Sequence, residues 1–399
     1  MTKLLWVSNA PWMKTGYSGQ TALFVPLIKE LGYDIDILAQ SGLEGAPTTW
    51  EGIKVYNRWA HPWAEDAIMP AMRASKADFF ITLLDIWMYE PASWRGAKWC
   101  PYFPVDAEPV PRKIVENAKK SFAPITYSKF GYKQMLDAGV ETYYVPHAVD
   151  TSVYKPIPKA EARAFLRSDS PGGKVWRDDQ YVFGMVANNN DPLGRKAFAE
   201  HFEAFAMVLR HHPDARLYVH ASLKGGYDLR ELMDRFGITA ACWVPHPEEL
   251  NFGMSDSYMA NVYNGIDCLL SVTQGEGFGV PIIEAQACGT PVIVGDWTAM
   301  PELLFNGWKV AQDDATKWMQ QLGGCWFRPN PAAIAQEMEL AYNETNDPGV
   351  TAQTVAVVGS EYGVETVVNR YWKPTLKAIE SRIAENANAM TFANAMKAV

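Results

Sequence analysis

The residues with the clearest chemical potential lie in one segment, which runs from Ser271 to Val294 and reads SVTQGEGFGVPIIEAQACGTPVIV. An apolar run ends at Val272, and three glycines in alternate positions follow it. Pro281 suits the first turn of a helix, where its missing N–H leaves no hydrogen bond unmade. Free backbone N–H groups at the start of this helix would form a binding site for an anion such as a phosphate.

Two carboxylates, Glu276 and Glu284, flank the predicted anion site. A carboxylate in contact with a phosphate would repel it, so both side chains are better suited to accept hydrogen bonds from hydroxyl groups. A nucleotide-diphosphate-sugar has this layout, because hydroxyl groups lie at its two ends and the charge lies between them. From the glycine spacing alone, a solvated glutamate pair beside an ordinary helix start is an equally good interpretation.

The elements that must position these residues follow the same order in each half of the chain. Residues 3–8 are expected to form a buried strand, followed by a glycine-containing loop at 9–20 and a helix at 21–31. The order restarts with a strand at 181–187, a polar loop and an amphipathic helix at 196–210. Such units predict an α/β fold with two Rossmann-like domains, which bind ligands at the carboxyl ends of their strands. We therefore expect one site in the cleft between them.

Changes in composition along the chain predict the domain boundaries. The expected units are a first domain at 1–155, an interdomain connection at 156–179, a second domain at 180–362 and a helical tail at 363–399. Proline, glycine, serine and charged residues interrupt any periodic pattern in the connection. The tail either crosses back over the first domain or ends as a terminal helix without a role in the site.

Composition and charge narrow the class of protein. The 399 residues are enough for two or three domains of about 100–200 residues each. Hydrophobic residues make up 48% of the chain and charged residues 20%, which is typical of a globular protein. The net charge of −9 argues against a protein that mainly wraps nucleic acid, because such binding depends on Lys and Arg neutralising phosphates.

The cysteines and the apolar segments predict the compartment. Five cysteines are scattered without a CxxC pair, so neither a disulfide framework nor a zinc site is expected. The apolar run at the N-terminus is too short for a signal peptide. No transmembrane segment is expected, since no stretch approaches the roughly 20 apolar residues that a membrane helix needs. These observations predict a cytoplasmic protein in a reducing environment.

The segment EGFGVPIIEAQACGTPVI, with its two glutamates separated by seven residues, resembles the donor motif of the retaining GT-B glycosyltransferases of family 4 (glycosyl transferases group 1). The resemblance spans about residues 3–375. It implies two Rossmann-like domains that face each other across a cleft, with the acceptor on the first domain and the nucleotide-sugar donor on the second. Other positions match the family in the same order: Gly16 and Gly19, VPHAVD at 145–150, Arg195 and Lys196, YNGID at 263–267, and PEL at 301–303.

The resemblance also implies roles for individual residues. Arg195 and Lys196 would neutralise the donor diphosphate and the charge that grows as the nucleoside diphosphate leaves. Glu276 would hold hydroxyls of the transferred sugar, and Glu284 would hold the ribose. The family needs no metal and no further cofactor; its donor is expected to be UDP- or GDP-linked. The remaining donor-binding positions are Phe278, Gly279 and Val280 at the helix start, the Val244 backbone beside the base, and Gly16 and Gly19. The two last glycines could instead serve only a strand-to-helix turn.

The chain departs from the common family pattern in its first domain. Many relatives carry a histidine at the end of a first-domain strand, and here Asp106 and Asp85 stand in the comparable stretches. We expect Asp106 to contact the acceptor or the transferred sugar and place Asp85 second, although a turn or capping role would also explain each. His147 is interpreted as a structural hydrogen-bonding residue. Five tryptophans either line an acceptor groove or belong to the core: Trp12, Trp59, Trp63, Trp87 and Trp94.

These features together predict a retaining, metal-independent glycosyltransferase that moves a sugar from a nucleotide-diphosphate-sugar to a hydroxyl group of a saccharide, lipid or other acceptor. One alternative is transfer to a hydroxymethylated base of phage DNA, in which nucleic acid would be a partner only as the acceptor. Alternatives of another class are a sugar-nucleotide epimerase, a phosphorylase, or a nucleotide-binding protein without activity. The acceptor, the sugar and the linkage are not predicted.

Overall fold

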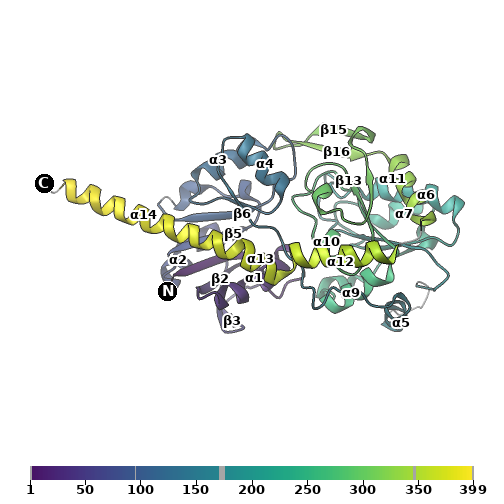
Figure 1. Ribbon diagram of the computed structural model, residues 1–399, viewed down its shortest axis with the longest axis horizontal. Helices are drawn as coiled ribbons and strands as arrows, with labels where there is room; N and C mark the ends of the chain where they lie inside the picture. Colours follow the sequence, from purple (N-terminus) through teal and green to yellow (C-terminus); the bar gives the residue numbers. More distant parts are fainter. Residues whose placement is uncertain (1, 95, 170–175, 345–346, 398–399) are drawn as a thin grey trace.

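The computed structural model describes residues 2–94, 96–169, 176–344 and 347–397, which form two lobes with a sheet in each (Figure 1). Among these residues, eight strands form the first sheet in the order β3-β4-β2-β1-β5-β6-β7-β8, and only the edge strand β3 is antiparallel to its neighbour. The strands are β1 (Lys3–Asn9), β2 (Asp34–Ser41), β3 (Thr48–Trp50), β4 (Ile53–Asn57), β5 (Phe79–Leu83), β6 (Trp99–Phe103), β7 (Ile125–Thr126) and β8 (Tyr143–Tyr144). The helices are α1 (Gly16–Glu30), α2 (Glu65–Ser75), α3 (Arg112–Lys120) and α4 (Lys129–Asp137).

Strand β1 shows why this sheet needs helices on both faces. Leu4 and Trp6 pack in one apolar cluster with α1, whereas Leu5 and Val7 pack in a second cluster with α2. Successive side chains of a strand point to opposite faces, so a continuous apolar run is stable only when both faces are covered. This burial places β1 at the centre of the sheet and brings its carboxyl end to the cleft.

The second sheet has a parallel order of its own. In the described residues it contains six strands, β11-β10-β9-β12-β13-β14, with β9 next to β12 as in a doubly wound fold. The strands are β9 (Val182–Val186), β10 (Arg216–His220), β11 (Cys242–Trp243), β12 (Cys268–Ser271), β13 (Val292–Gly295) and β14 (Gly307–Val310), and the hairpin is β15 (Ala315–Met319) with β16 (Cys325–Pro329). The helices are α6 (Phe198–His211), α7 (Leu229–Phe236), α8 (Pro247–Phe252), α9 (Asp256–Gly265), α10 (Val280–Ala287) and α11 (Pro331–Asn343).

Two local expectations differ from the structure. Helix α1 begins at Gly16, five positions before the expected start, because the hydroxyl of Thr15 accepts a hydrogen bond from the Ser18 N–H at 3.2 Å and caps the helix. Gly16 and Gly19 therefore lie in the first turns of a helix and not in a loop.

The segment 156–179 contains the helix α5 (Lys159–Asp169), which packs against α9 of the second domain. The interruption expected there falls partly on residues 170–175, outside the described residues.

The C-terminal tail returns to the first domain, as the fold prediction allowed. Helix α12 (Pro348–Tyr362) packs along α10, and the chain continues through α13 (Val364–Val367), the π-helical turn η6 (Val368–Trp372) and α14 (Lys373–Lys397). The Trp372 ring contacts Trp6 and Phe24 with centroids 5.5 and 5.6 Å apart. Figure 1 shows α14, in yellow, running across the first lobe and beyond it. None of the helices in the described ranges is long and apolar enough to cross a membrane.

A carboxylate from the second domain caps a helix of the first. Glu302, in the 3₁₀ turn η4 (Met300–Leu303), accepts hydrogen bonds from the backbone N–H groups of Lys129 and Phe130, both at 2.9 Å. These N–H groups belong to the first turn of α4, where a helix has no partners of its own for them and attracts negative charge. The contact therefore joins the two domains beside the cleft.

Removing this interdomain cap is expected to loosen the closed arrangement. Glu302→Ala should lower the free energy of unfolding by about 1 kcal/mol, the usual effect of losing a helix cap. It should also increase the radius of gyration in small-angle X-ray scattering, because fewer contacts hold the domains together. Glu361→Ala, which removes an exposed ion pair with Arg370, is the control. An unchanged radius and an unchanged stability would contradict the role of Glu302.

Candidate active site

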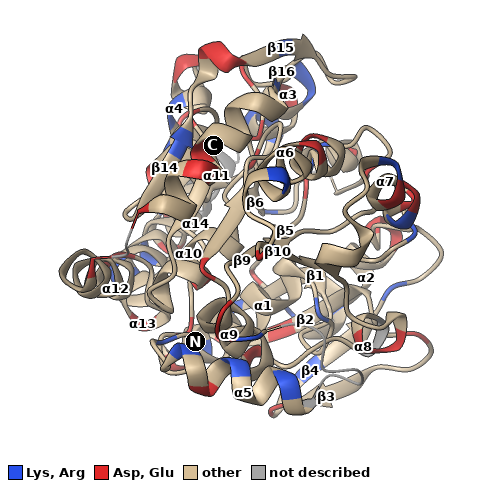
Figure 2. Cartoon of the chain, turned by 90° about the vertical axis from the view of Figure 1, so that its right-hand side faces the viewer, with Lys and Arg blue, Asp and Glu red and all other residues tan. Residues whose placement is uncertain are grey.

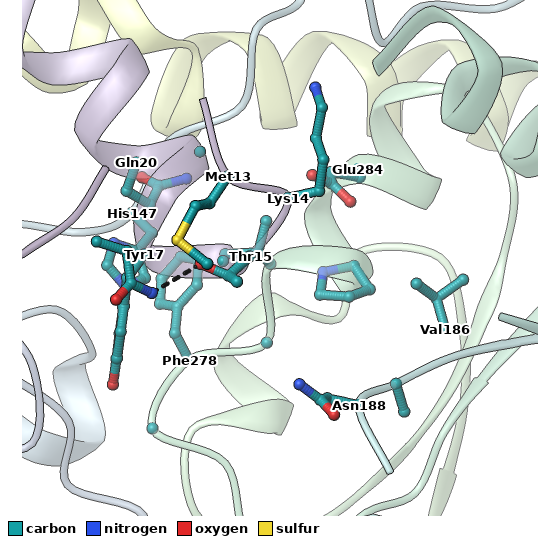
Figure 3. A pocket seen from close by; sticks show the side chains of 18 of the residues that line it. Met13, Lys14, Thr15, Tyr17, Gln20, His147, Val186, Asn188, Phe278 and Glu284 are labelled. Carbon is teal, nitrogen blue, oxygen red and sulfur yellow. Dashed lines mark hydrogen bonds between the residues drawn. The ribbon is translucent and has the colours of Figure 1, made fainter. Parts of the chain in front are cut away.

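The carboxyl ends of both sheets open into one cleft of about 1260 Å³. Asp85 and Asp106 line it from the loops after β5 and β6, and Val186 and His220 line it from the ends of β9 and β10. Figure 3 shows labelled side chains of both domains around the cavity, with Tyr17 and His147 on the first-domain side and Val186 and Asn188 on the second. The structure thus brings together residues that lie in separate halves of the sequence, as the two-domain prediction requires.

Glu276 lies between two cations at the second-domain side of this cleft. The Lys196 ammonium donates to its Oε1, and Arg195 Nη1 donates to its Oε2 at 3.2 Å and to the Gly275 carbonyl at 2.6 Å. Only 10% of the Glu276 side chain is exposed. Burial by itself opposes ionisation, but Lys196 and Arg195 outweigh it and lower the pKa of Glu276 to about 2. The carboxylate is therefore ionised at any physiological pH.

The two cations retain capacity for an anionic ligand. Burial lowers the pKa of Lys196, and the neighbouring Glu276 opposes that shift. Arg195 is also 3.9 Å from Asp106 and from Asp191, measured between Nε and the nearer carboxylate oxygen. Lysine carries three donor hydrogens and arginine five, so these contacts leave donors available. A diphosphate in the cleft would thus meet two oriented positive charges.

The helix α10 supplies the backbone part of the anion site. Gly279 caps it with φ of +108°, a conformation that glycine adopts far more readily than other residues, and a Cβ at this position would also lie 2.7 Å from Ile282. Phe278, Gly279 and Val280 all line the cleft. Because the first N–H groups of a helix have no intrahelical partner, this end of α10 can bind a negative charge.

Glu284 lies within α10 in a different environment from Glu276. Its Oε2 accepts a hydrogen bond from the Tyr263 hydroxyl at 2.7 Å, and it lines the cleft. Burial raises the pKa of Glu284 to about 7, against the effect of the tyrosine hydrogen bond. The two glutamates of the motif therefore differ, since cations hold Glu276 ionised while Glu284 titrates near neutrality.

The raised pKa of Glu284 has a consequence for stability. Its ordinary pKa is 4.5, so between pH 4.5 and about 7 the folded chain binds more protons than the unfolded chain, and stability falls as pH rises. Glu284→Gln should therefore exceed the wild type in free energy of unfolding at pH 8, by on the order of 3 kcal/mol. The difference should vanish near pH 4. Denaturant unfolding at pH 8 and pH 4 measures the difference in free energy of unfolding between the variant and the wild type, with Glu361→Gln as the charge-loss control. The same difference at the two pH values would contradict this account.

The two first-domain aspartates reach the same cleft. Burial raises the pKa of Asp106 to about 6; Arg195 counteracts the shift, and Asp85 and Glu276 add to it. Asp85 accepts a hydrogen bond from the Tyr17 hydroxyl at 3.3 Å, and burial raises its pKa as well. The Tyr17 and Tyr127 hydroxyls are 3.3 Å apart. Asp106 and Asp85 thus form, with two tyrosines, a polar surface that faces the Glu276 cluster.

His147 has a structural environment, in agreement with its interpretation from the sequence. Its Nδ1 is 3.0 Å from the Tyr102 hydroxyl, and its ring stacks on Tyr127 with centroids 4.0 Å apart. Burial lowers the pKa of His147 to about 3, so the ring is neutral at physiological pH. A neutral, stacked imidazole orients the aromatic side chains around it.

The remaining predicted positions divide into those at the cleft and one outside it. Gly16 and Gly19 line the cleft, and a Cβ at either would meet no atom within 4 Å, so open space lies in front of both. Val244 follows β11 and is not among the described residues that line the cleft; Ser222 and Leu250 line it in that region. Among the five tryptophans, Trp63 lines the cleft, Trp94 is buried in the core, Trp87 is half-buried against the core, and Trp12 and Trp59 are exposed.

The sequence interpretation missed the contacts of two motif glycines with the first domain. A Cβ on Gly275 would lie 2.3 Å from the Asp106 carbonyl oxygen, and a Cβ on Gly277 would lie 2.5 Å from the Pro104 Cβ. These residues therefore allow the Glu276 loop to touch the other domain, in addition to any turn that they permit. Tyr17 was also missed as a partner of Asp85, because nothing in the sequence relates two residues so far apart.

The fold and the motif define the class of protein. Residues 180–326 match the family model described as Glycosyl transferases group 1. The two Rossmann-like domains have the GT-B fold, and the second domain carries the similarity to the group 1 glycosyl transferases.

Individual relatives are similar over part or all of the chain. A D-inositol 3-phosphate glycosyltransferase of Segniliparus rotundus is 29% identical over 230 residues, which cover 54% of this chain and 47% of the relative, so the match spans about half of that protein. The sucrose-phosphate synthase of Thermosynechococcus elongatus has the same fold, with a TM-score of 0.71 and 13% identity over 96% of this chain and all of that one. Anabaena Alr3699/HepE, solved in complex with UDP and glucose, has a TM-score of 0.68 and 13% identity over 95% of this chain and all of the other.

Proposed function

We propose that this protein transfers a sugar from a nucleotide-diphosphate-sugar to a hydroxyl group of an acceptor, with retention of the anomeric configuration and without a metal ion. The observation that carries this proposal is the placement of Arg195 and Lys196 on Glu276, in the loop that leads into α10. Two cations and a helix N-terminus suit a diphosphate, and an adjacent ionised carboxylate suits sugar hydroxyls.

The proposed chemistry uses each part of the site in a defined way. Arg195, Lys196 and the first N–H groups of α10 would stabilise the negative charge that develops on the leaving diphosphate. This is the positive charge that a metal ion would otherwise provide. The acceptor hydroxyl would attack from the face that the diphosphate leaves, and a leaving phosphate oxygen would take its proton. Glu276 would orient the sugar through its hydroxyls, and Glu284 would bind the ribose.

One structural neighbour supports a nucleotide-sugar donor, and one relative supports glycosyl transfer. Anabaena Alr3699/HepE was crystallised with UDP and glucose, and the Segniliparus protein is named a glycosyltransferase. The epimerase, phosphorylase and inactive-protein alternatives are not favoured by these relatives. Transfer to phage DNA is not favoured either, because Lys and Arg are interspersed with Asp and Glu in the view of Figure 2 and the net charge is −9.

The donor can be tested before the acceptor is known. We expect one UDP- or GDP-sugar to raise the melting temperature more than ADP-glucose does, since a ligand that binds only the folded state stabilises it. The same donor should be hydrolysed slowly to the nucleoside diphosphate, and EDTA should not stop this hydrolysis. The absence of both stabilisation and hydrolysis across UDP-, GDP- and ADP-sugars would refute the proposed function.

A further inference from the structure

Every Lys and Arg side chain among the described residues of the cleft forms an ion pair with a carboxylate. Among the described residues, the cleft is lined by four Lys or Arg side chains and six Asp or Glu side chains: Lys14, Arg58, Arg195 and Lys196, and Asp85, Asp106, Asp150, Asp256, Glu276 and Glu284. Each of the four cations already has a carboxylate partner. Lys14 lies 3.7 Å from Asp256, and Arg58 lies 3.0 Å from Glu44. Arg195 and Lys196 both bind Glu276.

The histidines of the cleft add no positive charge. His147, His201 and His220 line it, and burial lowers their pKa values to about 3, 4 and 4. All three rings are therefore neutral at physiological pH. Once a diphosphate occupies Arg195, Lys196 and the start of α10, the rest of the cleft carries a negative excess.

Asp85 and Asp106 line the cleft from the first domain, the side on which the family resemblance predicts the acceptor. They follow the adjacent strands β5 and β6, and 27% of the Asp106 side chain remains exposed. Above its pKa of about 6, Asp106 is ionised and only accepts hydrogen bonds, so it matches hydroxyl groups, which donate, and repels phosphate oxygens. The Tyr17 and Tyr127 hydroxyls add two groups that both donate and accept. Trp63 lines the same cleft and offers an aromatic face for the C–H surface of a sugar.

We infer from this arrangement that the acceptor is an unphosphorylated, hydroxyl-rich molecule, such as a neutral saccharide or polyol, whose hydroxyls bind Asp85 and Asp106. The inference rests on the proposed function and specifies its acceptor. A phosphate ester of the same molecule would place a second anion beside two carboxylates and the donor diphosphate. Like charges at such an interface suppress binding, so we expect the phosphorylated form to bind at least about 100-fold more weakly.

Matched pairs of ligands test the inference. Each ligand is titrated by saturation-transfer NMR in the presence of the nucleoside diphosphate that stabilises the protein most. The pairs are glucose with glucose 6-phosphate, fructose with fructose 6-phosphate, and inositol with inositol 3-phosphate. The expected result is binding of at least one unphosphorylated member and much weaker binding of its phosphate. Preferential binding of the phosphates, or no binding of any unphosphorylated member, would overturn the inference.

A variant links the result to the first-domain aspartates. Asp85→Asn should raise the Kd of the bound saccharide by roughly tenfold, the loss expected for one charge-assisted hydrogen bond. Asp296→Asn, which removes an exposed ion pair with Lys309, should leave that Kd unchanged. An unaltered Kd in Asp85→Asn would also overturn the inference. Failure of the proposed function is distinguishable, because then no nucleoside diphosphate would stabilise the wild-type protein.

Discussion

Lys196→Ala is expected to lower kcat/KM for sugar transfer by about 10²–10³-fold, the effect typical of removing one preorganised group that stabilises transition-state charge. The ammonium of Lys196 donates to Glu276, and only 19% of the Lys196 side chain and 10% of the Glu276 side chain are exposed. The variant should stay folded, because Arg195 still neutralises the Glu276 carboxylate.

Release of the nucleoside diphosphate, with circular dichroism to verify folding, measures the effect of Lys196→Ala. Lys309→Ala is the matched control. Lys309 belongs to β14, pairs with Asp296, and is not among the described residues that line the cleft. Glu276→Ala should abolish transfer as well, and Glu276→Gln separates the loss of charge from the loss of the side chain. Near-normal turnover in Lys196→Ala or Glu276→Ala would refute the assigned site.

The second large effect is expected at Gly277, which carries no side chain and directly follows Glu276. Its backbone is not in the left-handed region, so alanine causes no local strain, but the new Cβ would lie 2.5 Å from Pro104 of the other domain. The domains must then separate slightly beside Glu276. Because a misplacement of about 1 Å in a reacting group can cost 10²-fold in rate, we expect Gly277→Ala to lower kcat by about that factor.

The comparison for Gly277→Ala is a glycine with free space around it. Gly359 lies in α12, and a Cβ there would meet no atom within 4 Å, so Gly359→Ala should leave turnover unchanged. Nucleoside diphosphate affinity should fall less than kcat in Gly277→Ala, because the second domain supplies most of the proposed donor contacts. Equal turnover in the two variants would show that closure does not need the Gly277–Pro104 contact.

Local sequence patterns predicted most of the buried strands and the motif, but not β3, β4, β14 or the β15–β16 hairpin. Alternating and continuous apolar runs predicted strands such as β1, β5 and β9, because burial of both strand faces depends only on the composition of a few consecutive residues. The start of α1 was misplaced, since the Thr15 cap and the following glycines were interpreted as a loop. The helix α5 was missed because the residues around it are rich in proline and glycine.

The contacts within the site and between the two domains join residues that lie far apart in the sequence, so no local pattern predicts them. Lys196 and Glu276 are separated by 80 positions and meet only because the loops after β9 and β12 open at the same sheet edge. Glu302 caps α4 across 172 positions, and neither segment alone indicates the other. The pairing of distant groups follows from the packing of whole sheets, which is a property of the complete chain.

The sequence by itself predicted the donor half of this protein: Glu276, Glu284 and the glycines between and before them indicate a helix start that can bind an anion, because helix capping and glycine conformation act over a few residues. Only the tertiary structure decided what faces that motif. It buried Glu276 between two cations, gave Glu284 a pKa near 7, and placed Asp85 and Asp106 across the cleft. Burial and charge proximity exist only between packed elements, so these properties appear only in the folded chain.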